Sequence, residues 1–425
     1  MRWKAILLVL AVSVVTLGVP SAGTRAALAK CTDPLGCVEI PKGSTLRIAT
    51  IFSLTETIPE VGIDSFRGVE LAVQFRGGTL LGRTIEIASF DESCDPSKGV
   101  EAAEQILITP RVAGVVGTTC SGSAFEAAPV LSGAGMSMIS PSNTNPGLTD
   151  PSVREPFYFR TSYNDRFHGS TLATFAGSLS LGSANTIDDD SGHSDGVKNA
   201  FIESFDGVGG ATSLRIEARS FEDDFVDELG AVAVSPPDLL FFPLLSPSEN
   251  LGTLVAQARD VSALDGTRLA GIADFLFESG FLSTAGEDAE GVLATSPDFE
   301  FANPDYEDVL DAYVKQYGEP PTGTCCLPGQ PLRWHAFSFD ATNVLLNAIE
   351  AVAFVDGNKL LIPRTALRDA ILGTSNYTGL VGNLTCESRE EALGSVAAGD
   401  CNPNDAFLVL EVQEGEFVPI FSTTE

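Results

Sequence analysis

The chain is short of basic residues, and that shortage excludes two classes of partner. It has 25 Lys and Arg against 57 Asp and Glu in 425 residues, and its formal charge is −32 at pH 7. Loss of an amino-terminal segment with Arg2, Lys4 and Arg25 would make this charge −35. Such a surface repels nucleic acid and anionic lipid, so we expect neither partner. The acidity indicates a salt-rich or acidic habitat, or only a well-solvated surface.

Histidine is also rare, and the sequence has no CxxC pair. The three histidines, His168, His193 and His335, are scattered along the chain. Clustered Cys and His ligands are typical of zinc sites. The acidic run at 188–190 lacks the spacing of an EF-hand loop. We therefore expect no metal and no cofactor.

The usual signatures of catalysis are missing too. The stretch CSGS, at 120–123, offers a cysteine and two serines, but no histidine lies near it in sequence and it is not a GxSxG nucleophile elbow. No Gly-rich phosphate loop with a lysine appears. We do not expect an enzyme.

After residue 29, no stretch is long and apolar enough to cross a bilayer. Residues 1–29 have the pattern of a signal peptide, because two basic residues precede the run AILLVLAVSVVTLGV and small residues follow it. Cleavage near Ala22 and cleavage near Ala29 both fit. Lys30 stands where a lipid anchor on Cys31 would need a small residue. We expect an exported, periplasmic or otherwise extracytoplasmic protein that is soluble after signal removal.

Eight cysteines follow this segment, and export allows disulfides. Cys94 and Cys120 each end a strand-like run, and neighbouring parallel strands would place both at one sheet edge, which predicts a bridge between them. Two further pairs are close enough in sequence to close small loops: Cys31 with Cys37, and Cys386 with Cys401. Cys325 and Cys326 are adjacent, and they either form a vicinal disulfide or pair elsewhere.

From Lys42 onward, strand-like and helix-like segments alternate with short connections, which predicts an α/β fold with parallel sheets. One series, from LRIATIFSL to VVGTTC, supplies a sheet of at least four strands. A second series after YFRTSYND supplies another sheet, and the chain ends in a hairpin whose turn is Glu414 and Gly415. Two such lobes side by side would leave a cleft for a small ligand.

Residues 115–149 form a predicted strand, helix and strand in which both strands end in hydroxyl-bearing residues. The helix is expected from Ser123 to Gly135. Open parallel sheets bind ligands at the carboxyl ends of their strands. The N–H groups at a helix start also attract anions without a lysine or arginine. The pattern predicts a small polar ligand here.

This chain resembles the branched-chain amino acid (Leu/Ile/Val-type) binding proteins of ABC importers, which are type I periplasmic binding proteins. The likeness runs from about Leu46 to the end and is carried by residues 115–149 with GVELAVQFRGGTLLGRTIEIASFDESCDP, YFRTSYNDRFHGSTLA, DDDSGHSDGVKNAF, STAGEDAEGVLATSP, FSFDATNVLLNAIE and LRDAILGTSNYTGLVGNLTC. It implies two Rossmann-like lobes, a ligand cleft between them, three hinge crossings near Ser162, Pro297 and residue 406, and the Cys94–Cys120 bridge. The implied division is 1–29 for the signal, 45–162 plus 297–406 for the N-terminal lobe, and 163–296 plus 407–425 for the C-terminal lobe.

The resemblance also implies ligand contacts. Ser121 matches the serine that holds the carboxylate of an amino acid, and Ser142 and Thr144 match the segment that holds the ligand from the next strand. Asp274 matches an acidic residue that pairs with the ammonium group. Read without the family, Ser121 or Ser123 would only cap the helix, Thr144 would only satisfy loop backbone groups, and Asp274 would cap the helix that follows it.

The sequence departs from the family at three further positions of the expected pocket. Val61 and Leu245 stand where leucine-type binders place aromatic side chains over the ligand, and His193 stands where the family usually has a tyrosine. The loss of aromatic walls changes the shape of the pocket, so the ligand need not be leucine. The segment CCLPGQPLRWH and the residues between Cys386 and Cys401 have the character of local elaborations.

The function that this resemblance implies is capture of an amino acid-like ligand by cleft closure and its delivery to the permease of an ABC importer. We expect a monomer. Two alternatives remain open from the sequence. One is a ligand such as a short amide, urea or an aromatic carboxylate, and the other is a sensor module of the same fold.

Overall fold

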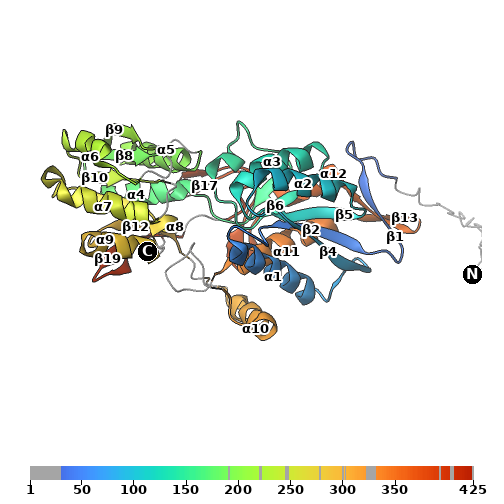
Figure 1. Ribbon diagram of the computed structural model, residues 1–425. Coiled ribbons are helices and arrows are strands. Elements are labelled where there is room, and N and C mark those ends of the chain that lie inside the picture. The colour runs from blue at the N-terminus through green and yellow to red at the C-terminus, as the bar shows by residue number, and fades with distance from the viewer. Residues whose placement is uncertain are drawn as a thin grey trace, which may run out of the picture.

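The structure is a computed structural model, and it describes residues 30–189, 192–219, 223–244, 248–276, 279–298, 301, 303–321, 332–391, 394–402 and 406–423. The expected signal peptide at 1–29, Leu245, Cys325 and Cys326 lie outside these residues. The predicted α/β class is confirmed, because two mostly parallel sheets are flanked by helices. Figure 1 shows the two sheets with their helices as two lobes side by side.

The first lobe is built on a six-stranded sheet in the order β3-β4-β2-β5-β6-β7. All of its neighbouring strands pair in parallel except β3 with β4. β5 reads VAGVVG and is buried along its whole length, as a central parallel strand requires. The strands are β2 (Leu46–Phe52), β3 (Thr79–Leu80), β4 (Arg83–Asp91), β5 (Val112–Gly117), β6 (Met138–Ser140) and β7 (Tyr158–Arg160).

Helices cover both faces of this sheet. Side chains of β2 enter a core cluster on each face of the sheet. Ile48 packs in the cluster with side chains of α1 and α11, and Ile51 packs in the cluster with side chains of α2 and α3. α1 and α11 approach closely at Gly68, where a Cβ would lie 2.2 Å from the His335 carbonyl oxygen. The helices are α1 (Pro59–Phe75), α2 (Pro96–Ile108), α3 (Ser121–Gly133), α10 (Asp305–Tyr317), α11 (Trp334–Val352) and α12 (Arg364–Leu372).

The second lobe has a seven-stranded sheet in the order β20-β19-β12-β11-β10-β8-β9. β19 and β20 pair antiparallel, and their turn is Glu414 and Gly415, both at positive φ, as the sequence predicts. The strands are β8 (Ser183–Asp188), β9 (Ala211–Glu217), β10 (Leu239–Phe241), β11 (Arg268–Ile272), β12 (Leu293–Pro297), β19 (Phe407–Gln413) and β20 (Glu416–Ser422). The helices are α4 (Arg166–Ser178), α5 (Gly192–Gly207), α6 (Val226–Ala233), α7 (Ser248–Asp260), α8 (Ala273–Leu276) and α9 (Ser279–Ala285).

The remaining strands form three small antiparallel sheets, and three short 3-10 helices complete the described structure. The strands are β1 (Cys37–Pro41), β13 (Phe354–Asp356), β14 (Lys359–Pro363), β15 (Tyr377–Gly379), β16 (Gly382–Leu384), β17 (Arg389–Glu391) and β18 (Gly394–Val396), and the 3-10 helices are η1 (Pro146–Thr149), η2 (Ser262–Leu264) and η3 (Gly286–Ala289).

A buried ion pair lies where β7 ends and the chain leaves the first sheet. Arg160 is fully buried, and its Nε and one terminal nitrogen donate to the two carboxylate oxygens of Asp400 at 3.0 and 2.9 Å. The other terminal nitrogen donates to the carbonyl oxygens of Asn143 and Asn145. Asn164 donates to Asp400 at 2.8 Å. This network ties the segment after β7 to the segment that precedes β19.

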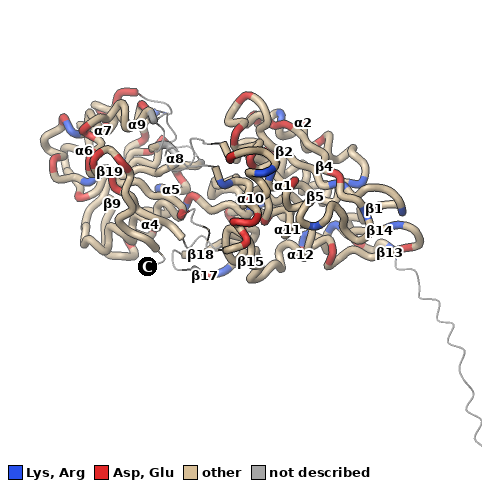
Figure 2. Tube along the Cα trace, turned by 90° about the horizontal axis from the view of Figure 1, so that it is seen from below, with Lys and Arg blue, Asp and Glu red and all other residues tan. Residues whose placement is uncertain are grey.

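Three disulfides are present among the described residues, in the pairings that the sequence predicts: Cys31–Cys37, Cys94–Cys120 and Cys386–Cys401. Cys401 follows Asp400 directly, and both cysteines of its bridge are fully buried. In Figure 2, acidic residues are spread over both lobes, and basic residues are fewer on each. No helix in the described part of the chain has the length and apolar character needed to traverse a bilayer.

Candidate functional site

The amino end of α3 is the first part of the candidate site. Cys120 precedes the helix in an extended conformation, and its side chain makes no capping hydrogen bond. The first N–H groups of a helix have no partner within it, so this end can receive an acceptor. Ser121 is the first residue of α3 and is half-buried, and its Oγ accepts from the Asn145 N–H at 3.4 Å. The contact brings α3 next to the loop that follows β6.

Glu92, which the sequence reading missed, lies beneath this helix end. It is fully buried, and its Oε1 accepts from the N–H groups of Thr119 and Cys120 at 3.1 and 3.2 Å. Its Oε2 accepts from the Ser123 hydroxyl. Burial raises the pKa of the Glu92 carboxyl above its usual range, against the opposing effect of these donors. Its position two residues before Cys94 was the available signal, because the Cys94–Cys120 bridge brings the end of β4 to the start of α3.

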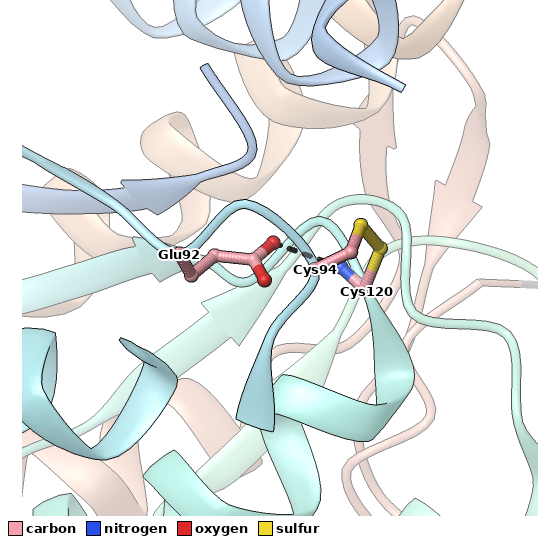
Figure 3. Close-up of side chains that lie close together, drawn as sticks. All are labelled: Glu92, Cys94 and Cys120. Carbon is pink, nitrogen blue, oxygen red and sulfur yellow. Dashed lines mark hydrogen bonds between the residues drawn. A yellow bond between two sulfur atoms is a disulfide. The ribbon is translucent and has the colours of Figure 1, made fainter. Parts of the chain in front are cut away.

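Glu92, Cys94 and Cys120 also form the one group of possible metal ligands found among the described residues, with ligand atoms within 4.8 Å of one another. Figure 3 shows the two sulfur atoms joined in a disulfide and the Glu92 carboxyl directed at the Cys120 N–H. Disulfide sulfurs are not thiolate ligands. The cluster therefore serves to join β4 and α3 rather than to bind a cation in this oxidation state.

The loop after β6 carries Ser142 and Thr144. Ser142 is buried, and its hydroxyl donates to the Thr119 carbonyl oxygen at 3.1 Å, so it fastens this loop to the end of β5. Thr144 is half-buried, and its carbonyl oxygen accepts from the Asp165 N–H at 3.0 Å. Ser121, Ser142 and Thr144 thus lie at the carboxyl ends of neighbouring strands, and Thr144 touches the start of α4.

Asp165 joins this loop to His193, the position where the sequence departs from the family tyrosine. His193 Nδ1 lies 3.0 Å from Asp165 Oδ2, and His168 Nε2 lies 3.8 Å from Oδ1. Burial alone would raise the pKa of Asp165, but attraction to His193 and His168 and a hydrogen bond from Thr144 hold that pKa below its usual range. Burial lowers the pKa of His168 to about 4, so its imidazole is neutral near pH 7.

Val61 lies in the first turn of α1 and is 4% exposed. It belongs to a buried apolar cluster with aromatic side chains from distant segments, namely Tyr163, Phe167, Trp334, Phe337 and Phe407. Tyr163 and Trp334 stack with ring centroids 6.0 Å apart. The aromatic side chains around Val61 therefore come from the segment after β7, the start of α11 and the start of β19, which no local sequence pattern around Val61 predicts.

On the second lobe, Asp274 lies in α8, directly after the carboxyl end of β11. β11 pairs with β10 on one side and β12 on the other, so it is central in the sheet. The structure describes only the backbone of Asp274, and Leu245 lies outside the described residues. Among the predicted residues, the structure brings Ser121, Ser142 and Thr144 together and links Thr144 to His193 through Asp165.

Comparison with known proteins supplies independent findings. A family model described as periplasmic binding protein matches residues 45–392. The leucine-, isoleucine-, valine-, threonine- and alanine-binding protein of Pseudomonas aeruginosa is 24% identical over 319 residues, which cover 74% of this chain and 81% of that protein.

Two solved structures are similar in fold. A leucine-binding protein from Thermotoga maritima superposes with a TM-score of 0.65 at 23% identity, over 89% of this chain and 98% of that chain. A solute-binding protein of an ABC transporter from R. palustris, solved in complex with benzoate, superposes with a TM-score of 0.61 at 20% identity, over 89% and 96% of the two chains. The matched fold thus holds different carboxylates in different proteins.

Proposed function

Since the chain belongs to the periplasmic binding protein family and is a non-enzymatic solute-binding protein of an ABC transporter with the type I fold, we propose that its solute is a branched-chain or other apolar amino acid. In this proposal the protein works outside the cytoplasm and delivers the solute to the importer's permease. The ligand lies between the N-terminal lobe, 45–162 plus 297–406, and the C-terminal lobe, 163–296 plus 407–425. Closure about the three crossings traps it.

The first lobe holds the carboxylate in this proposal. The supporting observation is the contact between α3 and the loop after β6, since the Ser121 Oγ lies 3.4 Å from the Asn145 nitrogen and Thr144 lies one residue before it. A helix amino end carries about half a positive charge and free N–H donors, so a carboxylate can bind there without a basic side chain. Ser142 supports the loop through its bonds to the end of β5.

The second lobe holds the ammonium group. Asp274 follows the central strand β11, and a carboxylate directed into a closing cleft is costly unless it meets a cation. An α-ammonium group supplies that cation. His193, held by Asp165, then contributes to the wall of the pocket on α5. Val61 and Leu245 contact the apolar side chain of the ligand.

A second candidate is an aromatic carboxylate. The R. palustris relative holds benzoate, and the buried cluster around Val61 contains several aromatic rings. Rings stack favourably on rings, so such a ligand would be bound by its carboxylate at α3 and by its ring at the cluster. It has no ammonium group, so Asp274 would be irrelevant to its affinity.

A thermal-shift screen of the mature protein separates the two candidates. The protein is freed of co-purified ligand and mixed with amino acids, their decarboxylated and deaminated analogues, small amides, urea and aromatic acids. A ligand at 100 times its dissociation constant adds about 2.7 kcal/mol to stability. Stabilisation by aliphatic amino acids but not by either analogue supports the two-ended grip. Stabilisation by aromatic acids alone, or by amides and urea alone, would show that the ligand belongs to that class and is not an amino acid.

A further inference from the structure

The amino end of α3, which the proposed function assigns to the ligand carboxylate, already holds a carboxyl group of the protein. Glu92 accepts from the N–H groups of Thr119 and Cys120 and from the Ser123 hydroxyl, on the inner side of the helix end. Ser121, on the same first turn, is half-buried. A bound ligand carboxylate and the Glu92 carboxyl would therefore share one helix end.

In the part of the chain that the structure describes, no Lys, Arg or His forms an ion pair with Glu92, so no paired cation there offsets a second negative charge. The titratable groups on the elements around it are Arg47 on β2, Arg83, Glu86 and Asp91 on β4, Glu56 in the loop before α1, Asp95 at the N-cap of α2, Lys98, Glu101 and Glu104 on α2, and Glu126 on the exposed face of α3. Lys98 pairs with Glu56 at 2.9 Å. The Asp91 carboxylate accepts from the Leu54 and Ser93 N–H groups, so it adds negative charge.

Two carboxylates that share a site without a cation cannot both ionise at low cost. The ligand carboxylate is the stronger acid and lies nearer to solvent, so Glu92 is the group that takes the proton. A protonated Glu92 still accepts the two backbone N–H groups through Oε1. The partial positive charge of the helix end is then available to the ligand.

We propose that Glu92 is a positioning residue that holds a proton whenever a ligand carboxylate docks on the outer side of the α3 amino end, so that capture takes up about one proton per ligand. The inference rests on the proposed function and adds a pH dependence to it. Because the complex retains a proton that the free protein releases, affinity is highest at low pH and falls as pH rises. Burial of the Glu92 carboxyl, which already raises its pKa in the free protein, works in the same direction.

Calorimetric titration with L-leucine, and with benzoate as a second carboxylate, tests the inference. Binding heats are measured from about pH 5 to about pH 8 in pairs of buffers with different ionisation enthalpies. The wild type should take up protons in amounts that rise toward about one per ligand, and its affinity should fall by up to about tenfold per pH unit. This readout needs no variant, so it does not depend on any substitution folding.

Matched variants test whether Glu92 is the group that takes up the proton. Glu92→Gln stays neutral at all pH values, so its proton uptake should vanish and its affinity at about pH 8 should exceed that of the wild type by about tenfold or more. Glu126→Gln removes the same charge from the exposed face of α3 and should behave as the wild type does. Ser123→Ala removes a donor to the Glu92 carboxylate and should move the pH profile to higher pH.

The outcomes separate the inference from the function on which it rests. Tight leucine or benzoate binding by the wild type, with no proton uptake and the same profile as Glu92→Gln, would overturn the inference and leave the proposed function standing. Binding of carboxylates by Glu92→Gln alone would also overturn it, because Glu92 would then exclude such ligands. Failure of both proteins to bind any carboxylate would overturn the amino acid assignment and the inference together.

Discussion

Two regions of the first lobe bury charge in different ways. Where β7 ends, Arg160 and Asp400 are 0% and 1% exposed and meet each other through two hydrogen bonds. At the start of α3 and on α11, Glu92 and Asp340 are equally buried but meet only neutral donors. Asp340 accepts from the N–H groups of Leu380 and Val381, each at 2.9 Å, and its burial raises its pKa to about 7. A buried charge with a charged partner stays ionised, whereas burial raises the pKa of a carboxyl that meets only neutral donors.

The largest effect should come from breaking the paired charge. Arg160→Met leaves the Asp400 carboxylate buried without its cation, which should lower the free energy of unfolding by about 3–5 kcal/mol. Chemical denaturation measures it. Arg268→Met is the matched control, since that side chain is 42% exposed and lies 3.8 Å from Glu411, and it should cost about 1 kcal/mol or less. An equal loss of unfolding free energy in the two variants would show that the buried pair is worth no more than the exposed one.

Asp340, which has no cationic partner among the described residues, should make the stability of the folded protein depend on pH. Between the ordinary pKa of 3.8 in the unfolded chain and about 7 in the folded protein, only the folded state holds the Asp340 proton. Stability therefore falls as pH rises through this window, by about 1.4 kcal/mol per unit and at most about 4 kcal/mol in total. In Asp340→Asn this component should disappear, as denaturation curves from pH 4 to pH 8 would show. The exposed Asp311→Asn should keep the wild-type slope, and a wild-type slope in Asp340→Asn would contradict the assignment.

The proposed ligand contacts extend the comparison to binding, because the second lobe offers a charge and the first lobe offers neutral donors. Asp274→Ala should weaken an amino acid ligand roughly a hundredfold, or about 2.7 kcal/mol, through loss of a charge-assisted hydrogen bond. Calorimetric titration measures the change, with the exposed Asp288→Ala as control. An unchanged affinity would remove Asp274 from the site without affecting the fold.

The smallest effect belongs to a neutral contact. Ser121→Ala removes one hydroxyl from the α3 amino end but leaves its N–H groups, so affinity for a carboxylate ligand should fall only about fivefold, near 1 kcal/mol. The exposed Ser152→Ala should leave affinity unchanged in the same titration. A loss as large as that in Asp274→Ala would show that the hydroxyl, rather than the helix end, is the main anchor of the carboxylate.

Much of the fold was predictable because its signals are local. Alternating apolar segments indicate the two parallel sheets, and Glu414 and Gly415 mark the final hairpin turn. Boundaries were less accurate, since α3 runs from Ser121 to Gly133 rather than from Ser123 to Gly135. Part of the site was predictable for the same reason. The hydroxyl-bearing residues after β5 and β6 were expected to lie together, because parallel strands place their carboxyl ends at one edge of the sheet.

The sequence by itself determined the α/β class, the meeting of Cys94 with Cys120 and the polar ends of β5 and β6, because each depends on short-range periodicity and on strand direction. Only the tertiary structure decided that Arg160 meets Asp400 from 240 residues away, that Asp165 meets His193, and that Glu92 lies under α3. Such contacts depend on which elements the topology brings together. A single buried side chain that finds a distant partner leaves no periodic pattern in the sequence.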